Sequence, residues 1–364
     1  MQPAERAAWL RLIATPGLGP RTARHLLASF GLPDEVFGAG AGTLARAVPE
    51  PLARVLAARP SAEVQSIIDA TEHWLASAPS HGLVNLADAD YPRLLLETSD
   101  PPAVLFAVGR RELLSRPSLA IVGSRNATQQ GVANAEAFAG ALARSGLTIV
   151  SGLALGIDAA AHRGALDADS DAGTIAVVGT GVDIVYPASN RALTQRVREE
   201  GLVLSEFPLR TPAIAHNFPR RNRLIAGLAR GVLVVEAALR SGSLITARLA
   251  ADAGRDVFAI PGSIHSPLAK GCHRLIRDGA KLVESAHDIA GDLGLERTTQ
   301  APPEVIAPGP NAELLALIGH DPVDLDTLAT RSGRDAGSLS AALLELELAQ
   351  DVERLPGNRY QRLR

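Results

Sequence analysis

The chain has 364 residues, 46% of them hydrophobic and 21% charged, a composition that suits two or three globular domains and excludes an intrinsically disordered protein. The net charge of -3 argues against a wholly basic nucleic-acid coat. The N-terminus carries Glu5 and Arg6, and no run of about 20 apolar residues occurs, so we expect no signal peptide and no membrane span. The single cysteine, Cys272, excludes an internal disulfide and favours a reducing, cytoplasmic compartment.

Residues 1–80 are predicted to form a helical domain. Apolar residues recur at helical spacing, as in Trp9, Leu10 and Ile13, and prolines divide the segment into short helices. Residues 15–31, TPGLGPRTARHLLASFG, have the Gly-x-Gly turn between two helices that is typical of helix-hairpin-helix units. Such a turn directs backbone N–H groups at a DNA phosphate, although a plain packing module explains the same pattern.

Residues 83–293 are predicted to form a doubly wound α/β domain. Six apolar runs alternate there with helical stretches: LAIVG, TIVSG, TIAVVG, LVLSE, VLVVEA and DVFAIPG. Near-continuous apolar strands separated by helices indicate a parallel sheet that is covered on both faces. Ligands bind such sheets at the carboxyl ends of the strands, so we expect the functional residues to follow these runs.

Two segments complete the predicted organisation. Residues 294–310 concentrate proline and polar residues and are predicted to form a linker. Residues 311–364 show three helical stretches and two short β-like runs, the order of a winged helix.

The charges are unevenly distributed along the chain. Eight arginines and three acidic residues between 206 and 255 give a net charge of 8 minus 3, or +5, whereas two arginines and eight acidic residues between 311 and 352 give 2 minus 8, or -6. We therefore expect the central domain, and not the winged helix, to be the main anion binder.

The first candidate site is AIVGSRNAT, where a strand runs into Gly123, Ser124 and Arg125 before a helix. Backbone N–H groups and the positive end of a helix dipole suit a phosphate there, and Arg125 adds a charged fork. The spacing is not that of a dinucleotide fingerprint. The alternative is a tight strand-to-helix turn with a surface arginine.

Two other strand ends carry weaker signals. Asp158 and His162 lie four residues apart on one helix face, where they can form a metal or acid/base pair. We favour the structural interpretation, in which Asp158 caps the helix and His162 makes a buried hydrogen bond, because two ligands do not make a metal site. Tyr186 can stack on a base or serve equally well as a core tyrosine.

The most informative stretch is NFPRRNRLIAGL, where Phe218 precedes a cluster of polar and basic residues: Arg220, Arg221, Asn222 and Arg223. An aromatic ring beside clustered arginines provides both a stacking platform and phosphate contacts, the two ingredients of single-strand binding. The alternative is that Phe218 plugs the core while the arginines form local ion pairs.

Two more candidates lie at the same predicted sheet edge. Ser241, Gly242 and Ser243 follow the VVEA strand end and offer hydroxyl and N–H groups at a helix start. Lys270 stands at the start of the next helix, where it can contact a phosphate or remain solvated.

Taken together and in order, the motifs resemble the DNA-processing protein A family (DprA, also called Smf). The motifs that carry this resemblance run from about Tyr91 to Val283: GSR, SGLALGIDAAAH, GTGVDIVYP, SEFP, NFPRRNRLIAGL, VVEA, SGSLITA and GRDVFAIPG. The resemblance implies an extended Rossmann-like central domain, preceded by a sterile-alpha-motif-like domain and followed by a winged helix.

The same resemblance implies a function. It implies a cytoplasmic homodimer that binds and protects incoming single-stranded DNA and loads the RecA recombinase during natural transformation. Position by position, Ser124 and Arg125 match the family's GSR, residues 218–223 match its F-P-x-R-N-R, and residues 241–243 match its S-G-S. The chain departs from many members just before Phe218, where it reads TPAIAHN and His216 replaces a basic residue.

The alternative function is enzymatic, a Rossmann-like nucleotide hydrolase of the phosphoribohydrolase type. Such enzymes pair an arginine with an acidic base near a P-G-G-x-G-T loop, and the corresponding stretch here reads RSGSLITAR without paired glycines. Glu236, Asp158 or Asp183 would have to serve as the base. No P-loop or complete acid/base set is found, so we predict no catalytic residues, no metal and no cofactor.

Overall fold

The computed structural model describes residues 2–295, 311–319 and 322–363. All but the first two residues of the predicted linker lie outside the described residues. The chain divides into two compact units, residues 1–126 with 135–295 and residues 127–134 with 296–364, and each is described by itself.

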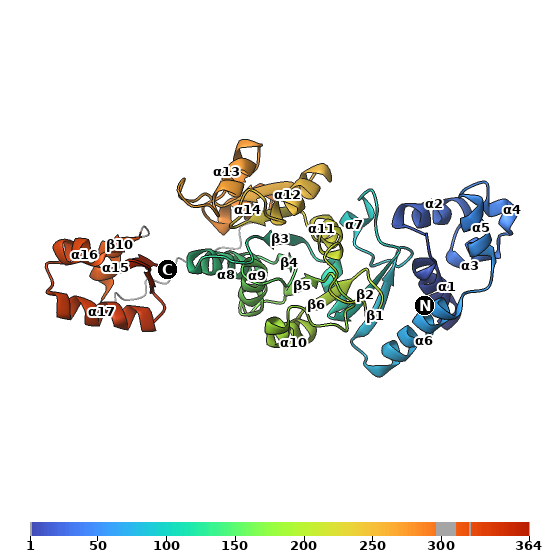
Figure 1. The fold of residues 1–364 in the computed structure, drawn as a ribbon, viewed down its shortest axis with the longest axis horizontal. Coiled ribbons are helices and arrows are strands. Elements are labelled where there is room, and N and C mark those ends of the chain that lie inside the picture. The colour runs from blue at the N-terminus through green and yellow to red at the C-terminus, as the bar shows by residue number, and fades with distance from the viewer. Residues whose placement is uncertain (1, 296–310, 320–321, 364) are drawn as a thin grey trace. The chain divides into compact units, whose positions relative to one another are not determined.

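The N-terminal region is helical, as predicted, and Figure 1 shows its helices grouped beside the β1 edge of the sheet. Several of these helices begin at a proline, because proline lacks the N–H that the first turn leaves unpaired and has a helical φ. Trp9, Leu10 and Leu12 are buried in its core. The helices are α1 (Pro3–Ala14), α2 (Pro20–Phe30), α3 (Pro33–Gly38), α4 (Ala41–Leu44), α5 (Glu50–Ala57) and α6 (Ala62–Ser77).

The central domain is built on a nine-stranded sheet with the order β1-β2-β6-β5-β4-β3-β7-β8-β9. All six predicted strands are present and parallel to one another, and all but the first half of β8 is buried. They are β3 (Ser118–Val122), β4 (Thr148–Ser151), β5 (Thr174–Val177), β6 (Leu202–Ser205), β7 (Gly231–Val234) and β8 (Asp256–Ala259). The prediction of a doubly wound parallel sheet is confirmed.

Three further strands extend this sheet at its edges. β1 (His81–Asn85) and β2 (Val104–Gly109) form an antiparallel pair that joins β6, and β9 (Lys281–Leu282) pairs with β8. A short helix, α7 (Arg93–Leu96), lies between β1 and β2, and a 3₁₀ turn, η1 (Arg111–Ser115), leads from β2 to β3.

The order of the strands places a topological switch point between β3 and β7. From β3 the chain winds outward through β4, β5 and β6, then returns through α11 to β7 on the other side of β3 and winds outward again to β9. The helices of this winding are α8 (Gln129–Arg144), α9 (Ile157–Leu166), η2 (Ala188–Asn190), α10 (Arg191–Glu200), α11 (Asn217–Leu228), α12 (Ser243–Asp252), α13 (Lys270–Arg277) and α14 (Ala286–Asp292). The carboxyl ends of β3 and β7 therefore flank the crevice where ligands bind in open α/β sheets.

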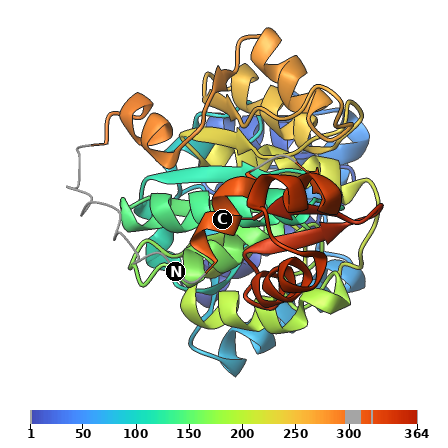
Figure 2. The ribbon, with the colours of Figure 1, turned by 90° about the vertical axis from the view of Figure 1, so that its left-hand side faces the viewer.

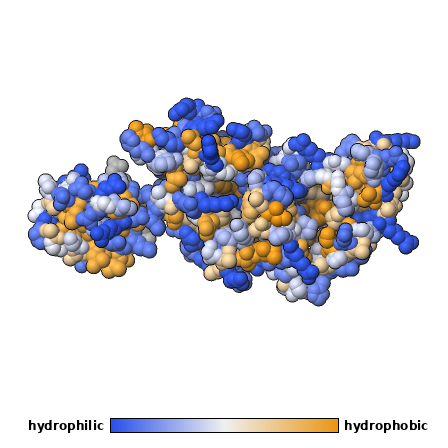
Figure 3. All heavy atoms as spheres, viewed as in Figure 1, coloured by the Kyte–Doolittle hydropathy of each residue, from blue (hydrophilic) through white to orange (hydrophobic). Residues whose placement is uncertain are grey.

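The C-terminal unit contains the predicted winged helix, drawn in red in Figure 2. Its core is formed by leucines such as Leu314, Leu328 and Leu339. Its elements are α15 (Ala312–Ile318), β10 (Val323–Asp324), α16 (Leu325–Ser332), α17 (Ala336–Leu348), β11 (Val352–Leu355) and β12 (Arg359–Arg362). Hydrophobic surface appears in Figure 3 where Figure 1 places α17, which exposes Leu344 and Leu348.

Among the described residues, we find no helix with the length and apolar character needed to span a bilayer.

Candidate nucleic-acid interface

A hollow of about 810 Å³ opens at the switch point, and we call it the switch hollow. It lies at the carboxyl ends of β3, β4 and β7, with α11 and the start of α12 on its sides. Its lining consists of Val122, Gly123, Ser124, Arg125, Asn126, Ala154, Asp158, Tyr186, Ala213, Ala215, Phe218, Pro219, Arg221, Asn222, Ile225, Ala238, Arg240, Ser241, Gly242, Ser243, Ile245, Thr246 and Leu268. Three arginines and one aspartate are the charged members, so the lining is cationic.

An aromatic platform stands in this hollow. The ring centroids of Phe218 and Tyr186 are 5.4 Å apart with the planes tilted by 39°. The guanidinium carbon of Arg125 lies 5.7 Å from the Phe218 ring centroid, within the range of a cation–π contact. Tyr186 is 46% exposed, so its ring is accessible to a ligand. The group therefore combines two rings with a cation that has no ion-pair partner in the described part of the chain.

The helix α11 divides the predicted arginine cluster between its faces. Phe218, Arg221, Asn222 and Ile225 line the switch hollow, at the spacing of one helical face. Arg220 and Arg223 lie on another face, where both bind the buried carboxylate of Glu206. Arg220 and Arg223 thus form local ion pairs, as the alternative interpretation has it, and their contact with DNA stays a prediction.

The Glu206 site is a compact ion-pair cluster beside the hollow. Arg220 Nη2 lies 3.2 Å from Glu206 Oε2, and Arg223 donates to the same oxygen and to the carbonyl oxygen of Asp100 at 2.7 Å. Burial raises the pKa of the Glu206 carboxyl, and the two guanidinium groups oppose that rise. The cluster joins α11 to the end of β6.

Arg221 is buried beneath the hollow and is not an open phosphate clamp. Its guanidinium donates to the carbonyl oxygens of Gly152, at 2.6 Å, and Val177, and so joins the ends of β4 and β5. Burial lowers its pKa to about 10, and the nearby carboxylate of Asp158 opposes that change. These bonds give Arg221 a structural role, and its contact with DNA stays a prediction.

Because Gly152 has no side chain, the buried charges of Arg221 and Asp158 both fit beside it. A Cβ at this position would lie 2.4 Å from Arg221 Nη1 and 2.6 Å from Asp158 Oδ2, so any larger residue would displace one of them. Asp158 Oδ2 accepts the amide N–H of Gly152 at 3.1 Å and that of Ala154 at 3.4 Å. Asp158 thus fixes the loop that leads into α9. The prediction that it caps the helix is wrong, because the N-cap is Gly156 and the carboxylate accepts N–H groups of the preceding loop instead.

His162 is likewise structural in its contacts. It is buried, and its Nδ1 lies 2.7 Å from Thr174 Oγ1 on β5. Burial, together with the positive charges of Arg221 and Arg163, lowers the His162 pKa to about 3, so the imidazole is neutral at pH 7. Among the residues the structure describes, no group of three or more His, Cys, Asp or Glu side chains is arranged to hold a metal.

The residues predicted to bind a phosphate after β3 lie in a loop and not in the first turn of the following helix. The helix α8 starts at Gln129, and the Thr128 hydroxyl accepts the N–H of Gly131 in its first turn at 2.9 Å. Gly123, Ser124 and Arg125 instead line the switch hollow directly from the loop. The Ser124 carbonyl accepts the N–H of Ile157 at 3.1 Å, which ties this loop to the start of α9.

The start of α12 also lines the switch hollow. Ser241, Gly242 and Ser243 line the hollow, and the Ser241 and Ser243 hydroxyl oxygens are 2.7 Å apart. The N-terminal end of this ten-residue helix directs the positive end of its dipole toward the hollow.

Nine of the twelve predicted residues line the switch hollow: Gly123, Ser124, Arg125, Phe218, Arg221, Asn222, Ser241, Gly242 and Ser243. Arg220, Arg223 and the exposed Lys270 do not. Arg240 was missed, although it directly precedes the S-G-S motif and lies in the basic 206–255 segment.

The comparisons with known proteins agree with this architecture. The family model "DNA recombination-mediator protein A" matches residues 82–294. The chain belongs to this family. A "DprA-like N-terminal HHH domain" matches residues 3–41 and a "DprA winged helix domain" matches residues 298–358, which confirms the predicted types of the two flanking domains.

Individual relatives show the same relationship. The chain is 43% identical to Protein Smf of Escherichia coli over 309 residues, which cover 82% of this chain and 81% of that protein. It is 49% identical to the DNA processing protein DprA of Streptococcus pneumoniae over 209 residues, 57% of this chain and 73% of that protein.

Two solved structures share the fold. The X-ray structure of DNA processing protein A from Streptococcus pneumoniae has a TM-score of 0.64 and 38% identity, covering 77% of this chain and 95% of that one. DNA processing protein A from Helicobacter pylori has a TM-score of 0.53 and 31% identity, covering 58% of this chain and 95% of that one. The Helicobacter pylori structure concerns the single-stranded DNA binding mode of that protein.

Proposed function

We propose that this chain binds single-stranded DNA in the switch hollow. The observation that carries the proposal is the Arg125, Phe218 and Tyr186 group, in which two rings and a cation line one accessible hollow. Unpaired bases stack on aromatic rings whatever their sequence, and arginines neutralise the phosphates beside them. Family membership supports the same assignment, as does the Helicobacter pylori relative that binds single-stranded DNA.

The geometry favours a single strand over a duplex. In a duplex the bases are stacked on one another and their faces are closed to Phe218 and Tyr186. The positive N-terminal end of α12 and the arginines Arg125 and Arg240 then supply the phosphate contacts. This arrangement resembles the platform-and-cation sites of other single-strand binders.

We further propose, from the family resemblance, that the bound strand is protected and passed to the RecA recombinase during natural transformation. The proposal includes a homodimer and a cytoplasmic location. Loading of RecA is tested by strand exchange with single-stranded DNA that is first covered by a single-strand binding protein. Addition of this chain is expected to restore exchange, and the absence of any stimulation would contradict the RecA part alone.

The binding proposal is tested by titrating labelled single-stranded DNA, blunt duplex and mononucleotides with the full chain across a range of salt concentrations. We expect single strands to bind far more tightly than duplex, with log affinity falling linearly as log salt rises. Equal affinity for duplex, or affinity that is independent of salt, would contradict it. The same samples, analysed for released base or phosphate, test the prediction of no hydrolysis.

A further inference from the structure

The helix α17 of the C-terminal unit is apolar on two opposite faces. One face is buried in the core of the unit and comprises Leu339, Ala342, Leu343 and Leu346. The other face is exposed, and we call it the outer stripe: Gly337, Ala341, Leu344 and Leu348. Its members are spaced four, three and four residues apart, the repeat that keeps side chains on one side of a helix. A helix that is apolar all round is ordinarily buried, so we expect the outer stripe to be covered by a partner.

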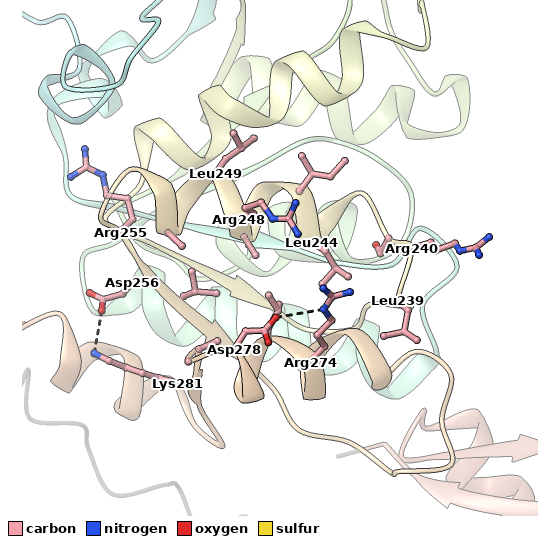
Figure 4. Close-up of a pocket in the computed structure, with 18 residues that line it drawn as sticks. Leu239, Arg240, Leu244, Arg248, Leu249, Arg255, Asp256, Arg274, Asp278 and Lys281 are labelled. Atoms are coloured by element: carbon pink, nitrogen blue, oxygen red, sulfur yellow. Dashed lines mark ion pairs between the residues drawn. The ribbon is translucent and has the colours of Figure 1, made fainter.

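The two leucines of the outer stripe are among the most exposed hydrophobic residues of the described chain. Leu344 is 57% exposed and Leu348 is 78% exposed, and they lie one helical turn apart. Leu239 is 54% exposed but has a different setting, because it lies beside arginines such as Arg240 in the pocket of about 670 Å³ that α12 and α13 line (Figure 4). The leucines of α17 therefore form an apolar strip of their own, in the hydrophobic surface that Figure 3 shows over this helix.

The charged residues of α17 flank the outer stripe and are acidic. Glu345 and Glu347 are exposed, one on each side of the stripe. Their carboxylates repel a nucleic acid, so the occupant of the stripe is a protein surface. Glu345 Oε2 already accepts a hydrogen bond from the side-chain amide of Asn311, at 3.0 Å, within the same unit. The occupant must therefore cover the leucines without placing acidic groups beside these glutamates.

A second copy of α17, packed in the antiparallel direction, meets the requirement of shape. When two copies are aligned about a point between residues 342 and 343, Leu344 of one lies opposite Ala341 of the other, and Leu348 lies opposite Gly337. Every layer then sets a large side chain against a small one, so that the two helices interdigitate. The parallel direction sets leucine against leucine and glycine against glycine, which leaves the layers uneven.

The same alignment meets the requirement of charge. Glu345 of one copy lies across from Ser338 of the other, and Glu347 lies across from Ser340, so no two carboxylates face each other. The N-terminal end of each helix also lies beside the C-terminal end of the other, where the opposite ends of the helix dipoles attract. A surface that complements itself in this way is what a two-fold interface requires.

We infer that the outer stripe is an interface with a second copy of this chain, in which two α17 helices pack antiparallel. The inference goes beyond the proposed function, because it concerns the C-terminal unit and does not depend on DNA binding. A single pair of helices buries less surface than a standard stable interface, so we expect a weak and reversible contact. Chemical crosslinking traps such a contact and is the basis of the test.

Two alanines of α17 report both the contact and its direction. Ala341→Cys and Ala349→Cys each place one thiol at an exposed position of this helix in the full chain. In the antiparallel pair the two copies of residue 341 lie about 5 Å apart along the helix axis, and those of residue 349 about 20 Å apart. With a short bis-maleimide reagent we expect the Ala341→Cys chain to be linked about tenfold more than the Ala349→Cys chain. The wild-type chain, whose Cys272 is buried, is the blank.

A leucine substitution shows whether the outer stripe carries the contact. Leu344→Ala, introduced into the Ala341→Cys chain, is expected to lower the linked fraction about tenfold, because it removes a leucine from both copies. Leu32→Ala, in the N-terminal region, is the matched control, since that leucine is 47% exposed and lies outside α17. It is expected to leave the linked fraction unchanged.

Equal linking at residues 341 and 349 overturns the inference, because it indicates parallel or unspecific association. Absence of linking at both positions also overturns it and assigns the outer stripe to a protein of another sequence. A linked fraction that Leu344→Ala leaves unchanged has the same force. Failure of the proposed function is seen separately, since the crosslinking contains no DNA and the titration of single strands does not report on α17.

Discussion

The guanidinium of Arg125 lies over the ring of Phe218, 5.7 Å from its centroid, although the two residues come from different elements of the sheet domain. Arg125 belongs to the loop after β3, and Phe218 to the first turn of α11. Their meeting depends on the crossover that carries the chain from β6 back past β3. The contact therefore places a cation and a stacking surface at the switch point before any ligand arrives, which lowers the cost of ordering them on binding.

Replacing Arg125 by alanine is expected to weaken single-stranded DNA binding by about 1 to 3 kcal/mol, the range for a charge-assisted hydrogen bond to phosphate. Folding is expected to survive because the side chain is exposed. Fluorescence anisotropy measures the affinity and a thermal scan the fold, with Arg191→Ala as the matched control. An unchanged affinity in a folded protein would show that Arg125 is an ordinary surface residue.

We predict that Arg221 stabilises the fold of the central domain and affects DNA binding only through that stability. Arg221→Met removes a buried guanidinium and leaves the Asp158 carboxylate buried without its nearby positive charge. Breaking a buried charge arrangement in this way costs about 3 to 5 kcal/mol of unfolding free energy. Urea denaturation measures this loss, and Asn222→Ala, on the same helix, is the control. A loss below about 1 kcal/mol would mean that Arg221 is not a structural support.

His162 is predicted to make the fold sensitive to acid. Its folded-state pKa of about 3 lies below the ordinary value of 6.5, so the unfolded chain binds more protons between those two values. Stability is therefore fully present above pH 6.5 and is lost toward pH 3, by up to about 1.4 kcal/mol per pH unit.

His162→Gln is expected to flatten this part of the pH dependence, because glutamine does not titrate. Urea midpoints at several pH values between 4 and 7 give the slope for each variant, and His265→Gln, at an exposed position, is the control. Equal slopes for wild type and His162→Gln would contradict the assignment.

The winged helix is predicted to be dispensable for strand binding, because acidic side chains repel phosphate. The two glutamates of α17, Glu345 and Glu347, would face the backbone unfavourably if this helix entered a groove. A chain that ends at Pro308 is therefore expected to keep most of its single-strand affinity. If the truncated protein stayed folded and lost tenfold or more, the tail would share the site.

The doubly wound sheet was predictable from the sequence, because the six central strands are apolar runs that alternate with helices, whereas the order of the strands in the sheet was not predicted. The strands β1 and β2 escaped prediction, since their antiparallel pairing joins residues such as His81 and Val108 that are distant in the chain. β9 has only two residues, too few for a hydrophobic pattern.

The candidate site was predictable in outline and less so in detail. Arg220, Arg221 and Arg223 are almost adjacent in sequence, yet successive residues of a helix point about 100° apart, so Arg221 lies in a different environment from the other two. The partner of two of them, Glu206, follows β6 and is brought near only by the fold. Arg240 lines the hollow just before α12, and its place directly before the S-G-S motif was the one local signal that could have indicated it.

The central claim is that bases of a single strand stack in the switch hollow, and photo-crosslinking tests it most directly. Single-stranded DNA that contains 5-iodouracil is irradiated with the full chain, and the modified residues are identified by mass spectrometry. We predict crosslinks at Phe218 and Tyr186 that disappear with excess unlabelled single strand and persist with excess duplex. Crosslinks confined to residues 311–363, with Phe218 and Tyr186 unmodified, would contradict the claim.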